Sequence, residues 1–82
     1  MGYEFWLSPE ATRALLGTER RQREKMETVL QRLAETPFRE PDFREKSPAG
    51  RIYDVKCFDD VIVTYWLDHA TKEVRIIRLE TA

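Results

Sequence analysis

Three strands are predicted over the last third of the chain, residues 51–80, and this segment limits the possible folds more than any other. Alternating side chains over 51–58 are typical of a strand with one packed face. Residues 61–67 are almost continuously apolar, which indicates a central strand covered on both faces. Residues 73–80 form the third strand. Only short turns separate the three, so the segment predicts an antiparallel meander.

The alternation over 51–58 assigns the side chains of the first meander strand to two faces. We expect one face to be wet, with Asp54 and Lys56 pointing into solvent. The other face is expected to be packed. It carries Tyr53, Val55 and Cys57.

The first half of the chain has the signals of a short strand followed by two helices. Residues 3–7 are aromatic and apolar, and Ser8 is placed to cap a helix over 9–16. Thr18 is expected to cap a longer helix over 19–35. The apolar stripe of this longer helix has helical spacing and is expected to be buried. It consists of Met26, Val29, Leu30 and Leu33.

A proline-containing segment connects the helices to the meander. Residues 37–50 hold three of the four prolines and are predicted to be a loop, which Phe38 and Phe43 anchor to the core. Together the elements predict a single α+β domain over residues 1–82. An N-terminal strand and a helical hairpin would pack on one face of a mainly antiparallel sheet that ends in a three-stranded meander.

Composition excludes several classes of protein. Fourteen basic and 15 acidic side chains leave a formal charge of −1, so any contact with nucleic acid requires a local basic patch. Cys57 is the only cysteine, so neither an internal disulfide nor a thiolate zinc site is expected. No apolar run approaches the ~20 residues of a membrane span, and no secretory leader is recognisable. We therefore expect a cytoplasmic protein without a metal, a cofactor or a membrane partner.

One local basic patch is recognisable between the loop and the first meander strand. Residues 43–56 contain four basic and two acidic side chains. Lys56 could supply a cation to stabilise a phosphorane formed by attack of an RNA 2′-hydroxyl, while Arg51, Arg44 and Lys46 hold phosphate. The alternative is that all four are ordinary solvated charges beside a sheet.

Other reactive side chains are expected to be structural. His69 is the only histidine and lies in a predicted turn, away from Lys56. Asp54 could orient Lys56 or act as a base, but pairing with a neighbouring cation is the expectation. Cys57 is expected to be buried and unreactive. Tyr53 and Tyr65 could stack on a base, but packing in the core is the expectation for both.

The order of elements resembles that of the RelE/ParE superfamily of bacterial toxins over essentially the whole chain. The resemblance is one of pattern and length rather than of a rigid motif. The segments that carry it are 5–11, 29–33, 51–56, 63–65 and 74–77.

The resemblance implies the toxin of a type II toxin–antitoxin module, with a cognate antitoxin protein as its partner. For the RelE-like branch it implies a ribosome-dependent mRNA endonuclease. Catalysis would then fall to Lys56 and Arg51, and the ribosome and mRNA would be further partners. RNA contacts would fall to Arg44, Lys46, Arg75 and Arg78.

Departures from the nuclease pattern leave other functions open. Asp54 stands where the first residue of the basic pair is expected, Val61 and Ile62 lie near the position of an arginine, and the chain stops at Ala82 without a basic, tyrosine-bearing tail. A ParE-like gyrase inhibitor, or a relative that has lost catalysis and only binds an antitoxin, fits these departures. A third hypothesis is an unrelated α+β fold that serves as a dimeric adaptor.

Overall fold

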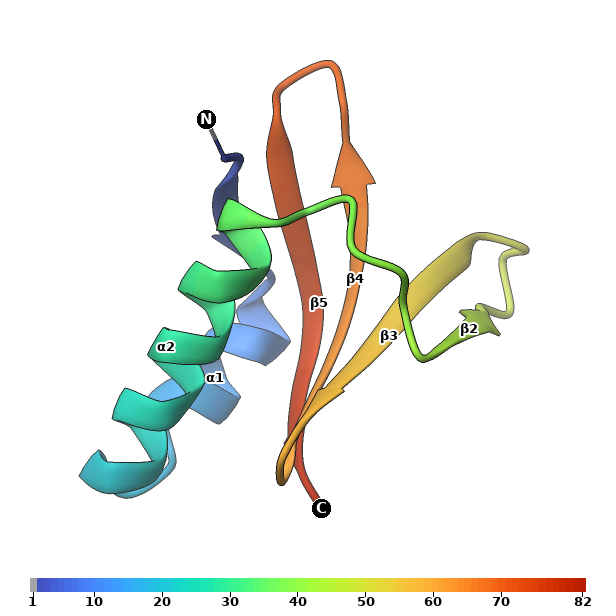
Figure 1. Ribbon diagram of the computed structural model, residues 1–82. Helices are drawn as coiled ribbons and strands as arrows, with labels where there is room; N and C mark the ends of the chain where they lie inside the picture. The colour runs from blue at the N-terminus through green and yellow to red at the C-terminus, as the bar shows by residue number, and fades with distance from the viewer. Residues whose placement is uncertain (1) are drawn as a thin grey trace.

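Two helices cover one face of a five-stranded sheet in the computed structural model, which describes residues 2–82 (Figure 1). The strand order is β1-β5-β4-β3-β2; β1 runs parallel to β5, and all other neighbours are antiparallel. In chain order the elements are β1 (Glu4–Leu7), α1 (Pro9–Leu16), α2 (Arg20–Glu35), β2 (Phe43–Lys46), β3 (Ile52–Phe58), β4 (Val61–Asp68) and β5 (Glu73–Thr81).

Local sequence signals place both helices. The Ser8 hydroxyl oxygen accepts a hydrogen bond from the amide of Ala11 at 3.0 Å, and Pro9 opens α1, as predicted. The prediction for α2 is wrong by one residue. Glu19, not Thr18, occupies the cap position and makes no side-chain cap bond, because Thr18 forms part of the turn between the helices.

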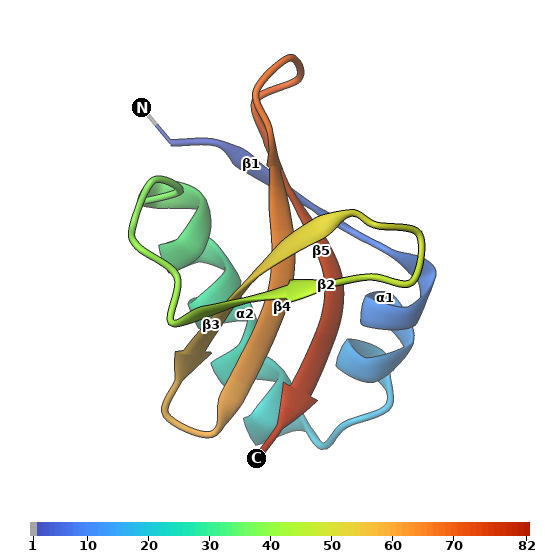
Figure 2. The same cartoon turned by 90° about the vertical axis from the view of Figure 1, so that its right-hand side faces the viewer.

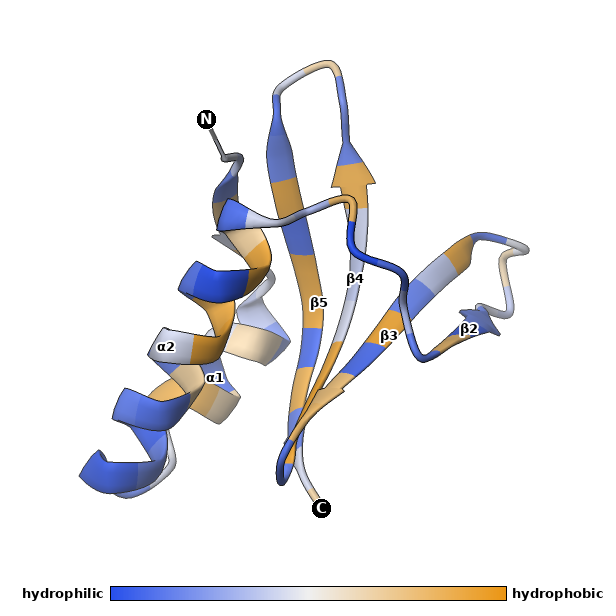
Figure 3. Ribbon diagram, in the orientation of Figure 1, coloured by the Kyte–Doolittle hydropathy of each residue, from blue (hydrophilic) through white to orange (hydrophobic). Residues whose placement is uncertain are grey.

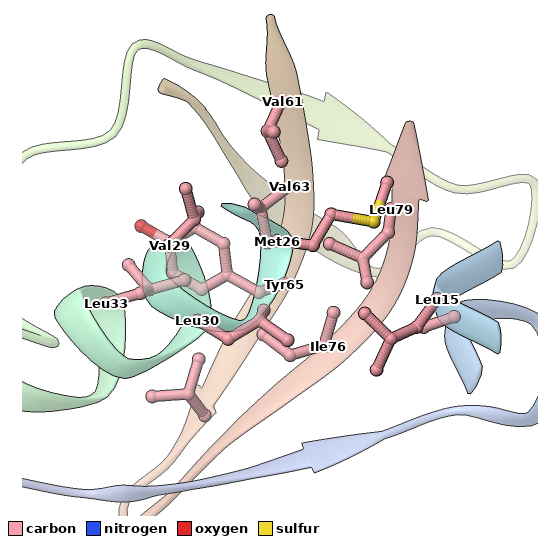
Figure 4. Close-up of a cluster of buried hydrophobic side chains, with 12 residues drawn as sticks. Leu15, Met26, Val29, Leu30, Leu33, Val61, Val63, Tyr65, Ile76 and Leu79 are labelled. Carbon is pink, nitrogen blue, oxygen red and sulfur yellow. The ribbon is translucent and has the colours of Figure 1, made fainter. Parts of the chain in front are cut away.

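The core lies between α2 and the centre of the sheet (Figure 4). Figure 3 shows that the hydrophobic residues of α2 face the sheet, whereas its opposite side is hydrophilic. Strand β4 lies between β3 and β5, which confirms the predicted central position of residues 61–67. The buried cluster comprises Ala11, Leu15, Met26, Val29, Leu30, Leu33, Val61, Val63, Tyr65, Val74, Ile76 and Leu79.

The sheet curls strongly at its β2 edge. Figure 2 shows β2 and β3 crossing in front of β4 and β5, on the side away from the helices. Two hydrogen bonds of 2.9 Å join the Arg78 guanidinium of β5 to the Glu45 carboxylate of β2, although β3 and β4 separate these strands in the sheet. We call the sheet face opposite the helices the uncovered face. The curl makes it concave.

Three predictions about the segment from the end of α2 to the end of β3 are wrong. Residues 37–50 are not all loop, because β2 pairs with the edge of β3. Phe38 and Phe43 do not anchor the core: they are 70% and 54% exposed, since Phe38 lies in the loop after α2 and Phe43 begins the edge strand β2. Cys57 is exposed rather than buried, because β2 begins opposite Val55 and does not extend over Cys57.

No helix within residues 2–82 is both long and apolar enough to cross a membrane.

Candidate functional site

The predicted cations lie on two different faces of the sheet. Cross-strand partners share a face. Lys56 is opposite Val63, and Arg44 pairs with Asp54, which is opposite Tyr65. Val63 and Tyr65 belong to the core, so Lys56 and Arg44 are on the helix side of the sheet. The same register puts Lys46 on that side and puts Arg75 and Arg78 on the uncovered face.

Lys56 is an anchored side chain rather than a solvated one. Its ammonium group donates to a carboxylate oxygen of Asp42 and to the backbone carbonyl of Glu40, both at 3.3 Å, and only 17% of its side chain is exposed. Asp42 also accepts a hydrogen bond of 2.6 Å from the Cys57 amide. This amide and then the Lys56 ammonium lower the pKa of Asp42. The prediction that Lys56 points from a wet face is therefore wrong.

The remaining cations of the basic patch do not converge on Lys56. Arg44 donates to Asp54 at 3.1 Å, as expected for a strand aspartate beside a cation. Lys46 is exposed and has no carboxylate partner in the described part of the chain. Arg51 instead stacks over the ring of Trp66, 4.4 Å from its centroid. Trp66 alternates with core residues along β4 and so belongs to the uncovered face.

The two arginines of β5 have acidic partners on the uncovered face. Arg75 lies over the ring of Trp6 at 4.7 Å and contacts Glu73 at 3.0 Å and Asp68 at 3.6 Å. Arg78 binds Glu45 and also Glu80, and hydrogen bonds to these carboxylates raise its pKa. A phosphate would have to displace these carboxylates before it could bind either guanidinium.

A hollow of about 270 Å³ opens on the helix side, between the α2–β2 loop and the β4–β5 turn. His69 lies in the β4–β5 turn, as predicted, and the hollow brings it to the same walls as Asp54 and Arg44. Two further residues that we did not predict as functional, Phe38 and Arg39, also line it. The sequence signal that could have pointed to them is the pair of prolines at positions 37 and 41, because proline restricts the backbone on both sides of Phe38 and Arg39.

Three rings from separate elements meet at the rim of this hollow. Phe38 is stacked on His69, with centroids 5.8 Å apart and planes at 10°. The rings of Tyr3 and Phe38 form a T-shaped pair with centroids 5.5 Å apart, and the Tyr3 hydroxyl is 2.9 Å from Nδ1 of His69. Chain segments that precede β1, follow α2 and follow β4 thus hold the Phe38 ring in place, and most of that ring remains in solvent.

A second, larger hollow of about 450 Å³ follows the outer edge of β1 beside α2. The amides of Glu4 and Ser8 donate toward β5, so the parallel register turns the peptide groups of Phe5 and Leu7 away from the sheet. These groups form an open edge that could pair with an added strand. The hollow is lined by Tyr3, Glu4, Phe5, Gln31, Ala34 and Glu35.

Among residues 2–82 no three histidine, cysteine or carboxylate side chains come together as a metal site.

Comparison with solved structures finds the same architecture over the whole chain. A chain of the RelBE2 toxin–antitoxin complex from Mycobacterium tuberculosis superposes with a TM-score of 0.80 at 15% identity, and the match covers 100% of both chains. The fold is RelE-like. The archaeal RelE–RelB complex from Pyrococcus horikoshii matches with a TM-score of 0.72 at 14% identity, covering 99% of this chain and 96% of the other.

A chain of the intact RelBE toxin–antitoxin complex of E. coli has the same fold. It superposes with a TM-score of 0.66 at 18% identity, and the match covers 98% of this chain and 96% of the E. coli chain. No protein-family model matches the sequence, and no curated protein matches it as a relative. The predicted α+β fold, with an N-terminal strand, a helical hairpin and a C-terminal meander, is confirmed.

Burial in the RelE-like core makes Tyr65 a marker of alkaline unfolding. Desolvation, and then the charge of Asp54, raises the pKa of Tyr65 from 10.0 to about 12. The unfolded chain ionises near its ordinary pKa, so stability is complete below pH ~10 and falls as the pH rises toward 12, by at most about 2.7 kcal/mol.

We expect urea unfolding at pH ~11.5 to give a lower free energy of unfolding than at pH ~9, and Tyr65→Phe to show a smaller decrease between these pH values. Equal decreases in both proteins would mean that other groups cause the alkaline loss.

Proposed function

We propose that this protein is the toxin of a type II toxin–antitoxin module, that it acts in the cytoplasm and that its partner is a cognate antitoxin protein. The observation that carries the proposal is the RelE-like fold, matched over 98 to 100% of this chain by chains of three structures solved as toxin–antitoxin complexes. The dimeric adaptor hypothesis receives no comparable support.

The open edge of β1 and the hollow beside α2 are the proposed seat of the antitoxin. An extended segment can add to such an edge through backbone hydrogen bonds, and its side chains can enter the adjoining hollow. The edge has two outward-facing peptide groups, those of Phe5 and Leu7, and the hollow has apolar and acidic walls. We therefore expect the antitoxin to extend the sheet at β1.

The arrangement of the cations favours a toxin that acts by binding, as a ParE-like gyrase inhibitor does, over one that cleaves RNA. Lys56, Arg44, Arg75 and Arg78 all contact carboxylates, and Arg51 lies on the opposite face from Lys56. A nuclease needs a cation that is free to stabilise a developing phosphorane.

Ribosome-dependent cleavage of mRNA is the second candidate activity. One observation favours it: Arg44, Lys46 and Lys56 share the helix side of the β2–β3 hairpin, where a phosphate could replace the Asp42 and Asp54 carboxylates. On this hypothesis Lys56 is the catalytic cation, and Arg44 with Lys46 holds the RNA. Arg51, Arg75 and Arg78 lie on the uncovered face. Catalysis by Arg51 and RNA contacts by the other two would therefore require a second part of the RNA to reach that face.

Induced expression in bacteria tests the toxin function. We expect growth arrest by the native chain, its relief by co-expression of the product of the adjacent reading frame, and co-purification of the two proteins. Leu30→Asp is the matched control, because a chain that does not fold should not arrest growth. Continued growth while the folded protein accumulates would contradict the proposal.

Two assays then separate the activities. Inhibition of supercoiling by purified gyrase would support the ParE-like mode. New breaks in mRNA on translating ribosomes, detected by toeprinting and lost in Lys56→Ala, would support cleavage instead.

A further inference from the structure

We infer that the hollow at the Phe38 rim binds a nucleoside phosphate, either free or as one unit of a single strand, with its base on Phe38 and its phosphate near Arg39. This site goes beyond the proposed toxin function. The residues that line it are different from those that line the hollow at the β1 edge, although Tyr3, which contacts Phe38, also lines that second hollow.

The first support is an aromatic surface that is both exposed and fixed. Phe38 is 70% exposed, yet its ring is stacked on His69 and makes a T-shaped contact with Tyr3. An isolated exposed ring on a loop samples several rotamers, whereas this ring is held on one side and open on the other. A planar base that stacks on the open side extends the existing stack. Because the Phe38 side chain is already fixed, little conformational entropy is lost when the base binds.

The second support is the chemistry of the walls. Arg39 follows Phe38 directly and has no carboxylate within ion-pair distance among residues 2–82. Arg44 lies on the same wall and is 59% exposed, so its contact with Asp54 is screened by water and can exchange for a phosphate. A base and a phosphate can thus be held at the same time, which fits a nucleotide better than an apolar ligand.

The third support is the balance of charge in the hollow. Two arginines, Arg39 and Arg44, face two carboxylates, Glu40 and Asp54, so these four groups leave no net charge. This hollow can accept one phosphate, but it has no net positive charge that would attract the further phosphates of a polyanion. We therefore expect binding of a single strand to depend weakly on salt, with a slope of about −0.7 on a logarithmic plot, as for one neutralised phosphate.

The test uses AMP, adenosine, ribose 5-phosphate and a short single-stranded oligoadenylate as probes, followed by NMR titration of the full chain. AMP should shift the amide signals of residues 37–44 and the ring signals of His69. Phe38→Ala should raise the half-saturating concentration by about tenfold, a typical loss for one stacked base. Phe43→Ala, which removes another exposed phenylalanine outside the hollow, should change it by less than about twofold.

Arg39→Gln separates the two halves of the ligand, because it should weaken AMP but leave adenosine unchanged. Binding of the oligonucleotide without binding of AMP would assign the site to a unit of a strand, whereas binding of both would admit a free nucleotide. The inference is overturned if neither AMP nor the oligoadenylate shifts these signals, or if Phe38→Ala binds AMP as tightly as the native chain does. Growth arrest reports on the proposed function separately, so failure of one does not imply failure of the other.

Discussion

Replacing Leu30 by aspartate should abolish folding. Leu30 is fully buried at the centre of the contact between α2 and the sheet. The substitution removes an apolar side chain and buries a carboxylate without a partner, which together cost more than about 4 kcal/mol. A domain of this size has only about 4 to 12 kcal/mol of stability. Circular dichroism should therefore show no cooperative thermal transition for Leu30→Asp.

Lys56→Ala is the matched control for this prediction. Its side chain lies on the same side of the sheet as Leu30 but at the β3 edge, where it binds the loop through Asp42 and the Glu40 carbonyl. We expect a cooperative transition whose midpoint falls by only a few degrees, because two exposed contacts are lost and no cavity forms in the core. Similar destabilisation of both variants would contradict the face assignment.

Phe5→Pro should release the antitoxin without unfolding the toxin. The Phe5 amide points away from β5, so proline removes a donor that the sheet itself does not use. If the antitoxin adds a strand at this edge, the variant loses that hydrogen bond, and the proline ring blocks the approach of the added strand. We expect the dissociation constant to rise by about 10- to 100-fold.

Phe5→Ala isolates the backbone contribution, because it removes the same side chain but keeps the amide. Affinity should fall less in Phe5→Ala than in Phe5→Pro when both are measured by calorimetry with the purified antitoxin. Equal losses would show that the side chain, and not the strand edge, makes the contact. Unchanged affinity of Phe5→Pro would mean that the antitoxin binds elsewhere.

The sequence was sufficient where local pattern and burial agree. The apolar stripe at Met26, Val29, Leu30 and Leu33 has the period of a helix, and the continuous run from Val61 fits only a central strand. The buried stripe and the central position of β4 are confirmed, because burial leaves a direct trace in the order of apolar residues. The α+β class followed from these elements alone.

The candidate site was less predictable, because contacts between distant segments decide it. Glu45 and Arg78 are 33 residues apart in the sequence, and no local sequence pattern predicts that the sheet curls far enough for them to form an ion pair. The same curl and the loop before β2 decide which cations are neutralised. The sequence correctly predicted that Lys56 and Val55 lie on opposite faces of β3. It could not predict which face the helices cover, and this decides that Lys56 lies on the helix side.

The sequence by itself determined the helices, the meander and the buried stripe of α2, because hydrophobic periodicity and helix caps act within a few residues. Only the tertiary structure decided that His69, Phe38 and Arg39 share a hollow, and that the arginines of β5 are already bound to carboxylates. The physical reason is that an ion pair or a ring stack depends on distances across the sheet, which the twist and curl of the strands set.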